Sequence, residues 1–382
     1  MRLPIYLDYA ATTPVDPRVA ALLGQHLTQD GVFGNPSSST HAFGRTAARA
    51  VETARAHVAA LLQVEPREII WTSGATEANN LALRGAMRAY VRRGRHLITS
   101  KAEHKAVLDV CRHLEADGCS VTYLDPDPNG SIACEQVAAA FRPDTVLVSL
   151  MHVNNETGTA QDLAAIGALT RARGILLHVD AAQSAGKLPL ELSRSHIDLL
   201  SLSAHKLYGP KGIGALFVRG GARCWPWVRP FRGGGQEADL RPGTLNVPAI
   251  VGFGEACKIA AMNLDKKRRF LDELTTRFRG ILHEKIPTAR VITPIEKSLP
   301  GTLSVIFPKV NSDVLVANCK TICISRGSAC NGAVGVSHVI NLIVEGGYRE
   351  CVVRISFGSQ SSLDGLDLFI NTVHKLLENQ HE

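Results

Sequence analysis

Short apolar segments alternate with longer amphipathic ones through the first half of this 382-residue chain. The apolar segments 145–152 and 175–179 have the length and composition of buried strands. The segments 76–92 and 163–173 have the apolar periodicity of helices that cover a sheet. This alternation predicts βαβ units and an α/β fold with a large, doubly wound, mainly parallel sheet. In such a sheet, ligands bind outside the carboxyl ends of the strands.

Beyond about residue 250 the alternation ends, and a different set of elements is expected. A long helical segment at 250–285 is followed by a predicted strand at 301–307, a helix at 313–319, a strand at 351–357 and a helix at 363–378. The other elements expected in the first part are strands at 68–71, 96–99 and 120–124 and helices at 41–62 and 105–117. We therefore predict an N-terminal arm (1–16) associated with a small domain, a large domain (17–255), and a smaller α+β domain (256–382) with a cysteine loop at about 320–337.

A lysine stands at one of the predicted strand ends. Lys206 follows the apolar run 197–202 and precedes the turn 209–212, so we expect it just past a buried strand, beside Ser203 and His205. A half-buried amine has a lowered pKa and becomes a nucleophile, which is the condition for a lysine that forms a Schiff base. A lysine at a strand end is as often a surface residue with its amine in solvent. This segment alone leaves both interpretations open.

Three further motifs fall at predicted strand ends of the same sheet. Residues 72–80 form a strand end, a glycine turn and a helix start, which suits a phosphate, although a plain N-cap has the same residues. His104 follows the next strand, and a single histidine of this kind is usually structural. Asp180 ends an apolar strand and needs a cationic partner, either a protonated pyridine nitrogen or a Lys or Arg side chain. Together with Lys206, these motifs supply the four groups that pyridoxal phosphate requires.

Composition excludes several other classes of protein. Charged residues make up 20% and hydrophobic residues 45%, which is typical of a globular protein. The net charge is +7, but the basic residues are scattered, so we expect no direct nucleic-acid binding. No apolar run is long enough to cross a bilayer, and the start has no long apolar leader, so we expect a cytoplasmic protein. The nine cysteines show no C-x-x-C or zinc-finger spacing, and we expect no metal site.

The order of these motifs resembles that of the cysteine desulfurases, which are pyridoxal-phosphate enzymes of the class-V aminotransferase family. The chain is most similar to the bacterial housekeeping and nitrogen-fixation desulfurases. The matching segments, spread over nearly the whole chain, are 6–14, 72–80, 103–104, 151–158, 178–183, 203–206, 241–244 and 325–330. The resemblance implies the aspartate-aminotransferase-like fold (fold type I) and a sulfurtransferase that acts on L-cysteine.

The resemblance also implies roles for the residues around the cofactor ring. Lys206 would bind the cofactor aldehyde and later take the proton from the substrate Cα. His104 would stack on the ring and move protons. Asp180 would keep the ring nitrogen protonated, so that the ring withdraws electrons, and Gln183 would bond the phenolic oxygen.

Other implied contacts concern the phosphate and the substrate. The residues that would hold the phosphate are Ala75, Thr76, Ser203 and His205. Thr244 would reach the phosphate of the neighbouring subunit, which implies a homodimer with shared sites. Asn155 and Arg354 would bind the substrate carboxylate, Arg354 through a bidentate pair.

Cys330 lies in a loop of small residues, and the resemblance implies that it carries the chemistry that distinguishes cysteine desulfurases. As a thiolate it would attack the sulfur of the bound cysteine, keep that sulfur as a persulfide and release L-alanine. An acceptor protein would then receive the sulfur for iron–sulfur cluster assembly, tRNA thiolation or DNA phosphorothioation. Arg326 stands where the family usually has a small residue, and it would lower the Cys330 pKa or attract an acidic acceptor.

Three alternatives stay open at this point. An aminotransferase or a selenocysteine lyase would also keep Lys206 and Asp180. A binding or scaffold protein would retain the fold without turnover, although the presence of Lys206, Asp180, His104 and Cys330 argues against such decay.

Overall fold

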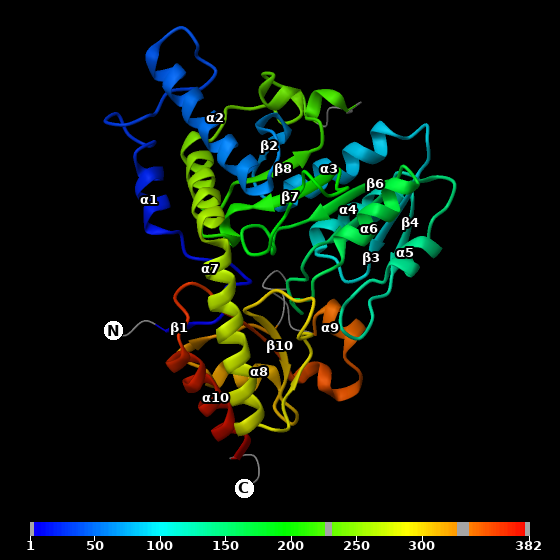
Figure 1. Ribbon diagram of the computed structural model, residues 1–382, viewed down its shortest axis with the longest axis vertical. Coiled ribbons are helices and arrows are strands. Elements are labelled where there is room, and N and C mark those ends of the chain that lie inside the picture. Colours follow the sequence, from blue (N-terminus) through cyan, green and yellow to red (C-terminus); the bar gives the residue numbers. More distant parts are fainter. Residues whose placement is uncertain (1–3, 226–230, 327–335, 379–382) are drawn as a thin grey trace.

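The computed structural model describes residues 4–225, 231–326 and 336–378 of the chain. Figure 1 shows two bodies of secondary structure that follow one another along the long axis of the molecule. The long helix α7 (Val247–Lys285) runs through both of them. Cys330 and half of the predicted cysteine loop lie outside the described residues.

A seven-stranded sheet forms the larger body. Its strands, in order across the sheet, are β2 (Ile69–Thr72), β8 (Gly214–Val218), β7 (Leu199–Ser203), β6 (Leu176–Asp180), β5 (Thr145–Met151), β3 (His96–Ser100) and β4 (Ser120–Leu124). Only β8 runs antiparallel to its neighbours among these strands. The predicted mainly parallel sheet is therefore confirmed. The strand β8 was not predicted, because glycines flank its short apolar run on both sides.

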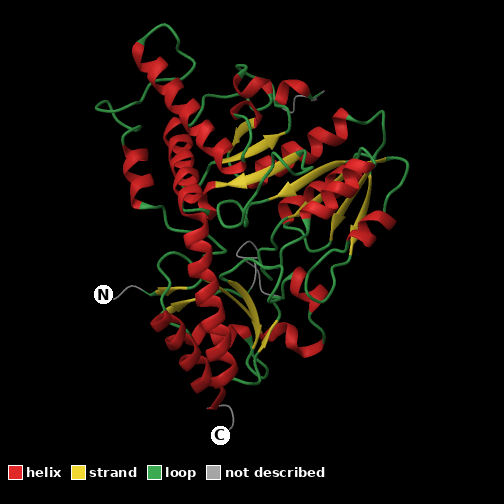
Figure 2. Ribbon diagram, viewed as in Figure 1, coloured by secondary structure: helices red, strands yellow, loops and turns green. Residues whose placement is uncertain are grey.

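Helices cover both faces of this sheet, as Figure 2 shows. They are α1 (Pro17–Gly24), α2 (Ala42–Leu62), α3 (Ala75–Ala89), α4 (Lys105–Ala116), α5 (Cys134–Ala139) and α6 (Leu163–Ala172). One core contains apolar side chains of α2, α6 and the first half of α7, and the other contains those of α3 and α4. The doubly wound arrangement is confirmed; the short helices α1 and α5 were not predicted.

The smaller body is built on a three-stranded antiparallel sheet with the order β12-β10-β9. Its elements are β9 (Arg290–Val291), β10 (Thr302–Ile306), α8 (Ser312–Asn318), β11 (Ile322–Cys323), α9 (His338–Ile343), β12 (Val352–Ser356) and α10 (Leu363–Glu378). Phe278 of α7 packs there against Phe357 and Phe369, so the second half of α7 belongs to this core. The predicted elements of this region are confirmed, and β9, β11 and α9 are additions.

The chain start lies with this smaller body rather than with the large sheet. Strand β1 (Ile5–Tyr6) pairs in parallel with β11, more than half the chain away. From there the chain crosses to the large sheet, where the Thr13 N–H donates to the His205 carbonyl oxygen at 3.0 Å. The N-terminal arm therefore connects the two bodies beside α7.

Among the described residues, α7 is the one helix long and apolar enough to cross a membrane. Half of its apolar stretch is buried inside the protein. Phe253 and Cys257, both fully buried, belong to the core shared with α2 and the sheet. The apolar stretch is thus accounted for as a core helix. Short 3-10 turns complete the fold at Pro66–Glu68, Ala204–Lys206, Ala222–Cys224, Gln236–Asp239 and Gly346–Cys351.

Candidate active site

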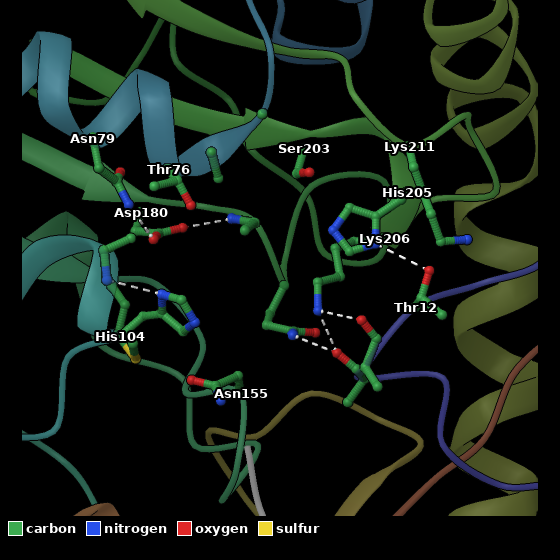
Figure 3. Close-up of a pocket in the computed structure, with 18 of the residues that line it drawn as sticks. Thr12, Thr76, Asn79, His104, Asn155, Asp180, Ser203, His205, Lys206 and Lys211 are labelled. Carbon is green, nitrogen blue, oxygen red and sulfur yellow. Dashed lines mark hydrogen bonds between the residues drawn. The ribbon is translucent and has the colours of Figure 1, made fainter. Parts of the chain in front are cut away.

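A cavity of about 500 Å³ opens at the carboxyl ends of the parallel strands (Figure 3). This is the position where a doubly wound sheet binds its ligands. The predicted site residues that line it are Ala75, Thr76, His104, Asn155, Asp180, Gln183, Ser203, His205, Lys206 and Arg354. Side chains from separate segments of the sequence therefore converge on one space.

Lys206 reaches the cavity from the turn that ends β7. The turn Ala204–Lys206 follows Ser203 directly, and the Gly209 N–H closes it on the Ala204 carbonyl oxygen at 3.0 Å. The Lys206 amine donates to the carbonyl oxygens of Ala10 and Ala11, at 2.6 and 2.8 Å. The amine therefore points into the cavity rather than outward to solvent, which was the alternative left open by the sequence.

A phosphate-sized cradle lies at the start of α3. The helix begins at Ala75 after Gly74, so its first N–H groups and the positive end of its dipole face the cavity. Glu77 secures this turn, accepting from the Ser73 N–H at 2.6 Å and from Arg241 Nε at 2.9 Å. Burial raises the Glu77 pKa, but these hydrogen bonds outweigh it, and the net shift is downward. The Glu77 carboxylate thus fixes the turn, while the first N–H groups of α3 remain directed at the cavity.

One glycine allows the cradle to sit against the sheet. A Cβ on Gly214, at the start of β8, would lie 2.7 Å from the Gly74 Cα and would overlap the Leu202 carbonyl oxygen. No side chain fits between these backbones. Gly214 is therefore required for the glycine turn to lie next to Ser203.

Asp180 is buried and is held by neutral donors. Its Oδ2 accepts from Asn79 Nδ2 at 2.7 Å, and its Oδ1 accepts from the Ala182 N–H at 2.9 Å. It makes no ion pair with any lysine or arginine in the part of the chain that the structure describes. The partner expected for this carboxylate is therefore a cationic group in the cavity, which a protonated pyridine nitrogen would supply.

His104 lies close to Asp180 in the cavity (Figure 3). It caps α4, since its Nδ1 accepts from the Ala106 N–H at 3.1 Å, which leaves the proton of the neutral ring on Nε2. Burial lowers the His104 pKa, an effect that Lys206 reinforces and Asp180 opposes. A neutral, flat imidazole is thus available for stacking on a ring.

His205 is also neutral at physiological pH. Burial lowers its pKa to about 4, with nearby Lys206 and Lys211 contributing. Its Nδ1 lies 3.0 Å from the hydroxyl of Thr12. Thr12, Lys211 and Asn79 line the cavity but were not predicted as site residues. Lys211 could have been found, because it follows Lys206 in the same turn segment.

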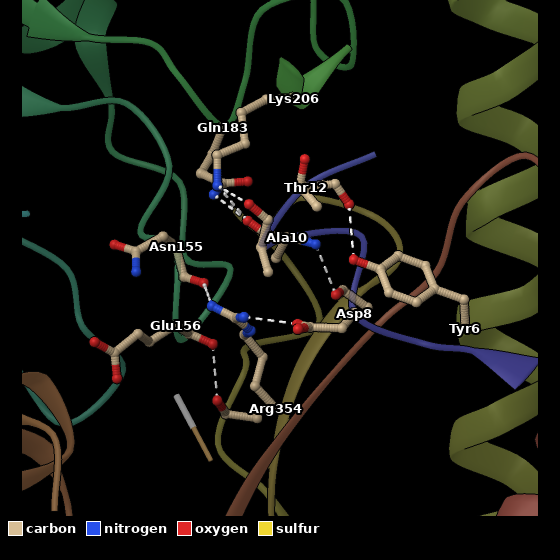
Figure 4. A network of polar contacts seen from close by, with 12 residues as sticks. Tyr6, Asp8, Ala10, Thr12, Asn155, Glu156, Gln183, Lys206 and Arg354 are labelled. Atoms are coloured by element: carbon tan, nitrogen blue, oxygen red, sulfur yellow. Dashed lines mark hydrogen bonds and ion pairs between the residues drawn. The ribbon is translucent and has the colours of Figure 1, made fainter. Parts of the chain in front are cut away.

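Arg354 enters the cavity from the other body of the molecule. It lies on β12, and its side chain is only 1% exposed. Its Nη1 donates to the Asn155 carbonyl oxygen at 2.8 Å, and its Nη2 to Asp8 Oδ1 at 2.7 Å (Figure 4). A cation and an amide side chain, that of Asn155, are thereby placed together at the cavity wall, opposite the cradle residues that suit a phosphate.

This set of groups fits pyridoxal phosphate. The cradle at Thr76 suits the phosphate, the buried Asp180 carboxylate suits the ring nitrogen, and the Lys206 amine suits the aldehyde. Gln183 lies beside the amine, and its Nε2 donates to the Ala10 carbonyl oxygen at 2.9 Å. Asn79 Oδ1 is buried without a partner among the described residues, so a further donor is accommodated near Asp180.

Residues 5–369 match the family model for class-V aminotransferases. The chain belongs to this family. It is 47% identical to cysteine desulfurase IscS of Shewanella loihica, an alignment that covers all of this chain and 95% of that protein. A solved structure of a NifS-like protein superposes with a TM-score of 0.90 at 35% identity, covering 98% of this chain and all of that one. The structure described as SspA in complex with cysteine gives 0.81 at 38% identity, covering 92% and 98% of the chains.

These similarities confirm the family and the fold predicted from the sequence, and with them pyridoxal phosphate as the cofactor. The chain is homologous to curated cysteine desulfurases over its full length. The alternative of a binding or scaffold protein that retains the fold without turnover is thereby removed.

One predicted site residue is not in the cavity lining, and another is not among the described residues. Thr244 lies in an exposed loop after the turn Gln236–Asp239, outside the cavity lining. Cys330 lies outside the described residues, so its role stays a prediction. Arg326, four positions earlier, forms an ion pair with Asp313 at the start of α8.

Proposed function

We propose that this chain, a cysteine desulfurase of the class-V aminotransferase family, transfers the sulfur of L-cysteine to Cys330 and releases L-alanine. The observation that carries the proposal is the convergence of the Lys206 amine and the Arg354 guanidinium on one cavity. An amino acid presents a carboxylate, which the Arg354 guanidinium complements. It also presents an amine, which would take the place of the Lys206 amine on the cofactor aldehyde. The similar structure described as SspA in complex with cysteine supports the choice of amino acid.

Pyridoxal phosphate, when bound, supplies an electron-withdrawing ring that weakens bonds at the substrate Cα and Cβ. Lys206 would bind its aldehyde, and Asp180 would hold the proton on the ring nitrogen. His104 would stack on the ring, and Gln183 would donate to the phenolic oxygen. The residues that would hold the phosphate are Ala75, Thr76, Ser203 and His205.

With the substrate bound, the Lys206 side chain would be the base that takes the Cα proton. The Ala10 and Ala11 carbonyl oxygens lie within 2.8 Å of its nitrogen and keep it in the cavity. Arg354 and Asn155 bind the substrate carboxylate, and this fixes the direction in which the cysteine side chain points. A guanidinium and a carboxylate form two parallel charge-assisted hydrogen bonds in such a pair.

Cys330 performs the sulfur transfer. Its thiolate attacks the sulfur of the bound cysteine, so that an S–S bond forms on Cys330 as the Cβ–S bond of the substrate breaks. The substrate carbon keeps the bonding electrons, takes up a proton and leaves in L-alanine. The persulfide on Cys330 then gives its outer sulfur to the thiol of an acceptor.

The assembly and the destination of the sulfur belong to the same proposal. We place the enzyme in the cytoplasm as a homodimer, in which Thr244 reaches the phosphate site of the partner. We divide the chain into an arm (1–16), a large domain (17–255) and a small domain (256–382) that carries Cys330. The acceptor is a protein of iron–sulfur cluster assembly, tRNA thiolation or DNA phosphorothioation.

The test is a comparison of Cys330→Ala with Cys323→Ala, in which an exposed cysteine on β11 serves as the matched control. With sulfur-labelled L-cysteine, the wild type and Cys323→Ala carry label on the protein and form L-alanine. Cys330→Ala is expected to bind L-cysteine, seen as a change in cofactor absorbance, but to carry no label. Its rate of L-alanine formation should fall by at least about a hundredfold, because the nucleophile is missing. Label and L-alanine at the wild-type rate in Cys330→Ala would overturn the proposal.

A second measurement identifies the acceptor. The labelled enzyme, separated from cysteine, is incubated with candidate acceptor proteins, and the transfer of label to each one is followed. A keto acid in place of L-alanine would instead point to an aminotransferase.

A further inference from the structure

Residues 5–13 of the N-terminal arm lie beside the active site and contact both Lys206 and Arg354 (Figure 4). Its own turn is closed by a hydrogen bond from the Tyr6 hydroxyl to the Thr12 carbonyl oxygen, at 3.0 Å. On one side, the Ala10 N–H donates to Ser356 Oγ of β12 at 2.8 Å. On the other side, the Ala10 carbonyl oxygen accepts from Lys206. The arm therefore has a fixed place between the two bodies of the molecule.

Asp8 is the charged residue of this arm that faces Arg354. Its Oδ1 accepts from Arg354 Nη2 at 2.7 Å, and the side chains are 18% and 1% exposed. A guanidinium this deeply buried requires a counter-charge, because an unpaired buried charge is strongly unfavourable. In the part of the chain that the structure describes, Asp8 is the carboxylate that forms an ion pair with Arg354.

The two partners lie differently with respect to the cavity. Arg354 and the Asn155 side chain line it, whereas Asp8 is not one of the described residues in its lining. Figure 4 shows Asp8 and Asn155 on opposite sides of the Arg354 guanidinium. Arg354 Nε is buried and has no hydrogen-bond partner among the described residues. The guanidinium therefore keeps donors that neither Asp8 nor the Asn155 carbonyl oxygen uses.

We propose that Asp8 is a positioning residue for substrate binding, which holds the Arg354 guanidinium so that its remaining N–H donors face the substrate carboxylate. The inference rests on the proposed role of Arg354 in the desulfurase reaction. Asp8 touches no reacting atom; it acts through the orientation and charge balance of Arg354. The arm that carries it is fixed by Ser356 and by the pairing of β1 with β11, so the carboxylate has little freedom to move.

A purely structural role for Asp8 makes a different prediction. Asp8 would then only tie the arm to β12. Its loss would lower the stability of the protein, or weaken ligand binding equally for ligands with and without a carboxylate. A pair of ligands that differ only by a carboxylate separates the two roles. L-alanine, the reaction product, and ethylamine form such a pair, and both are followed by the change they cause in the absorbance of the bound cofactor.

The experiment uses the holoenzyme and the variant Asp8→Asn, which keeps the shape of the side chain and a hydrogen-bond acceptor but removes the charge. We expect the dissociation constant for L-alanine to rise about tenfold and that for ethylamine to stay within twofold. For L-cysteine, KM rises by a similar factor while kcat stays within twofold. Asp8→Glu, which restores the charge, should recover most of the L-alanine affinity.

The matched control is Asp16→Asn, on the same arm, where the carboxylate pairs with exposed Arg18 at 2.8 Å and caps α1. Asparagine is also a good N-cap, so the two dissociation constants should remain at wild-type values. Equal losses of L-alanine and ethylamine affinity in Asp8→Asn, or no loss of either, would overturn the proposal. Arg354→Lys separates this failure from that of the proposed function. If Arg354 does not bind the carboxylate, this variant leaves the ratio of the L-alanine to the ethylamine dissociation constant unchanged. If it does, that ratio rises whatever Asp8 does.

Discussion

The Lys206 amine lies 2.6 Å from the Ala10 carbonyl oxygen, a backbone acceptor nearly two hundred positions away in the sequence. The same oxygen accepts from Gln183 Nε2 at 2.9 Å. Two side chains expected to contact the cofactor are thus held by a single carbonyl group of the N-terminal arm. Since a backbone oxygen cannot be removed by changing a side chain, the position of the Lys206 amine depends on the path of the arm.

Lys206→Ala should lose covalent attachment of pyridoxal phosphate. We expect the wild-type protein, reduced with borohydride after loading, to carry the cofactor on Lys206, because the Ala10 and Ala11 carbonyl oxygens hold this amine in the cavity. Lys211 also lines the cavity, and Lys211→Ala is the control that should retain the covalent label. Mass spectrometry of the reduced protein measures both. Label on Lys211 in the Lys206→Ala protein at the wild-type level would contradict the assignment.

Gly358→Ala should destabilise the protein through the arm. A Cβ at this position would overlap the ring of Tyr9, which is buried at 4% exposure. Overpacking of this kind costs about 1–3 kcal/mol in the free energy of unfolding. Adding Tyr9→Ala should remove that extra cost, so a double-mutant cycle in denaturant checks the contact. Gly347→Ala is the control, because a Cβ there meets nothing within 4 Å.

Glu237→Gln should be far more damaging than Glu52→Gln, although both residues pair with Arg55. Glu237 accepts from Arg55 at 2.7 and 2.9 Å and is buried, while Glu52 lies at 3.2 Å and is 64% exposed. Losing the buried partner leaves an uncompensated guanidinium and costs about 3–5 kcal/mol. Losing the exposed partner costs less than about 1 kcal/mol. Equal unfolding free energies of the two variants would contradict this reading.

The Glu237 pair also stabilises an unusual turn. Glu237, Ala238 and Asp239 all have positive φ, between 50° and 65°, which non-glycine residues rarely adopt. Glu237 Oε2 in addition accepts from the Trp71 N–H at 2.8 Å. We expect Glu237→Gln to loosen the loop that carries Thr244, and proteolysis of this loop would report it.

Stability should fall in mild acid because of His178. This residue lies within the sheet between the hydroxyls of Ser149 and Ser201, at 2.8 and 3.0 Å, and burial lowers its pKa to about 3. Between that value and the unfolded value of 6.5, the unfolded chain binds more protons, so stability decreases as the pH falls. From pH 7 to pH 5 the loss attributable to this residue is about 2 kcal/mol. Denaturant unfolding of His178→Gln should show a pH dependence smaller by this amount; an identical dependence would contradict the explanation.

Much of the fold followed from local patterns. The strands at 145–152 and 175–179 were predicted within one or two residues, because an apolar run bounded by turn residues has few alternatives. The strand β8 and helix α9 were missed, since both begin among glycines or small residues and form only when neighbouring elements are in place. Their conformation is set by tertiary packing rather than by local propensity.

The sequence by itself determined the side of the site that belongs to the large sheet. Lys206, Asp180 and the turn before Ala75 each follow an apolar strand, and parallel strands bring their carboxyl ends to one edge. The tertiary structure decided how the other side is paired. Arg354 was expected there from the family resemblance, but its carboxylate partner Asp8, at the opposite end of the chain, was not. A buried ion pair between such distant residues exists only after both bodies have packed, because burial makes the pairing of the two charges obligatory.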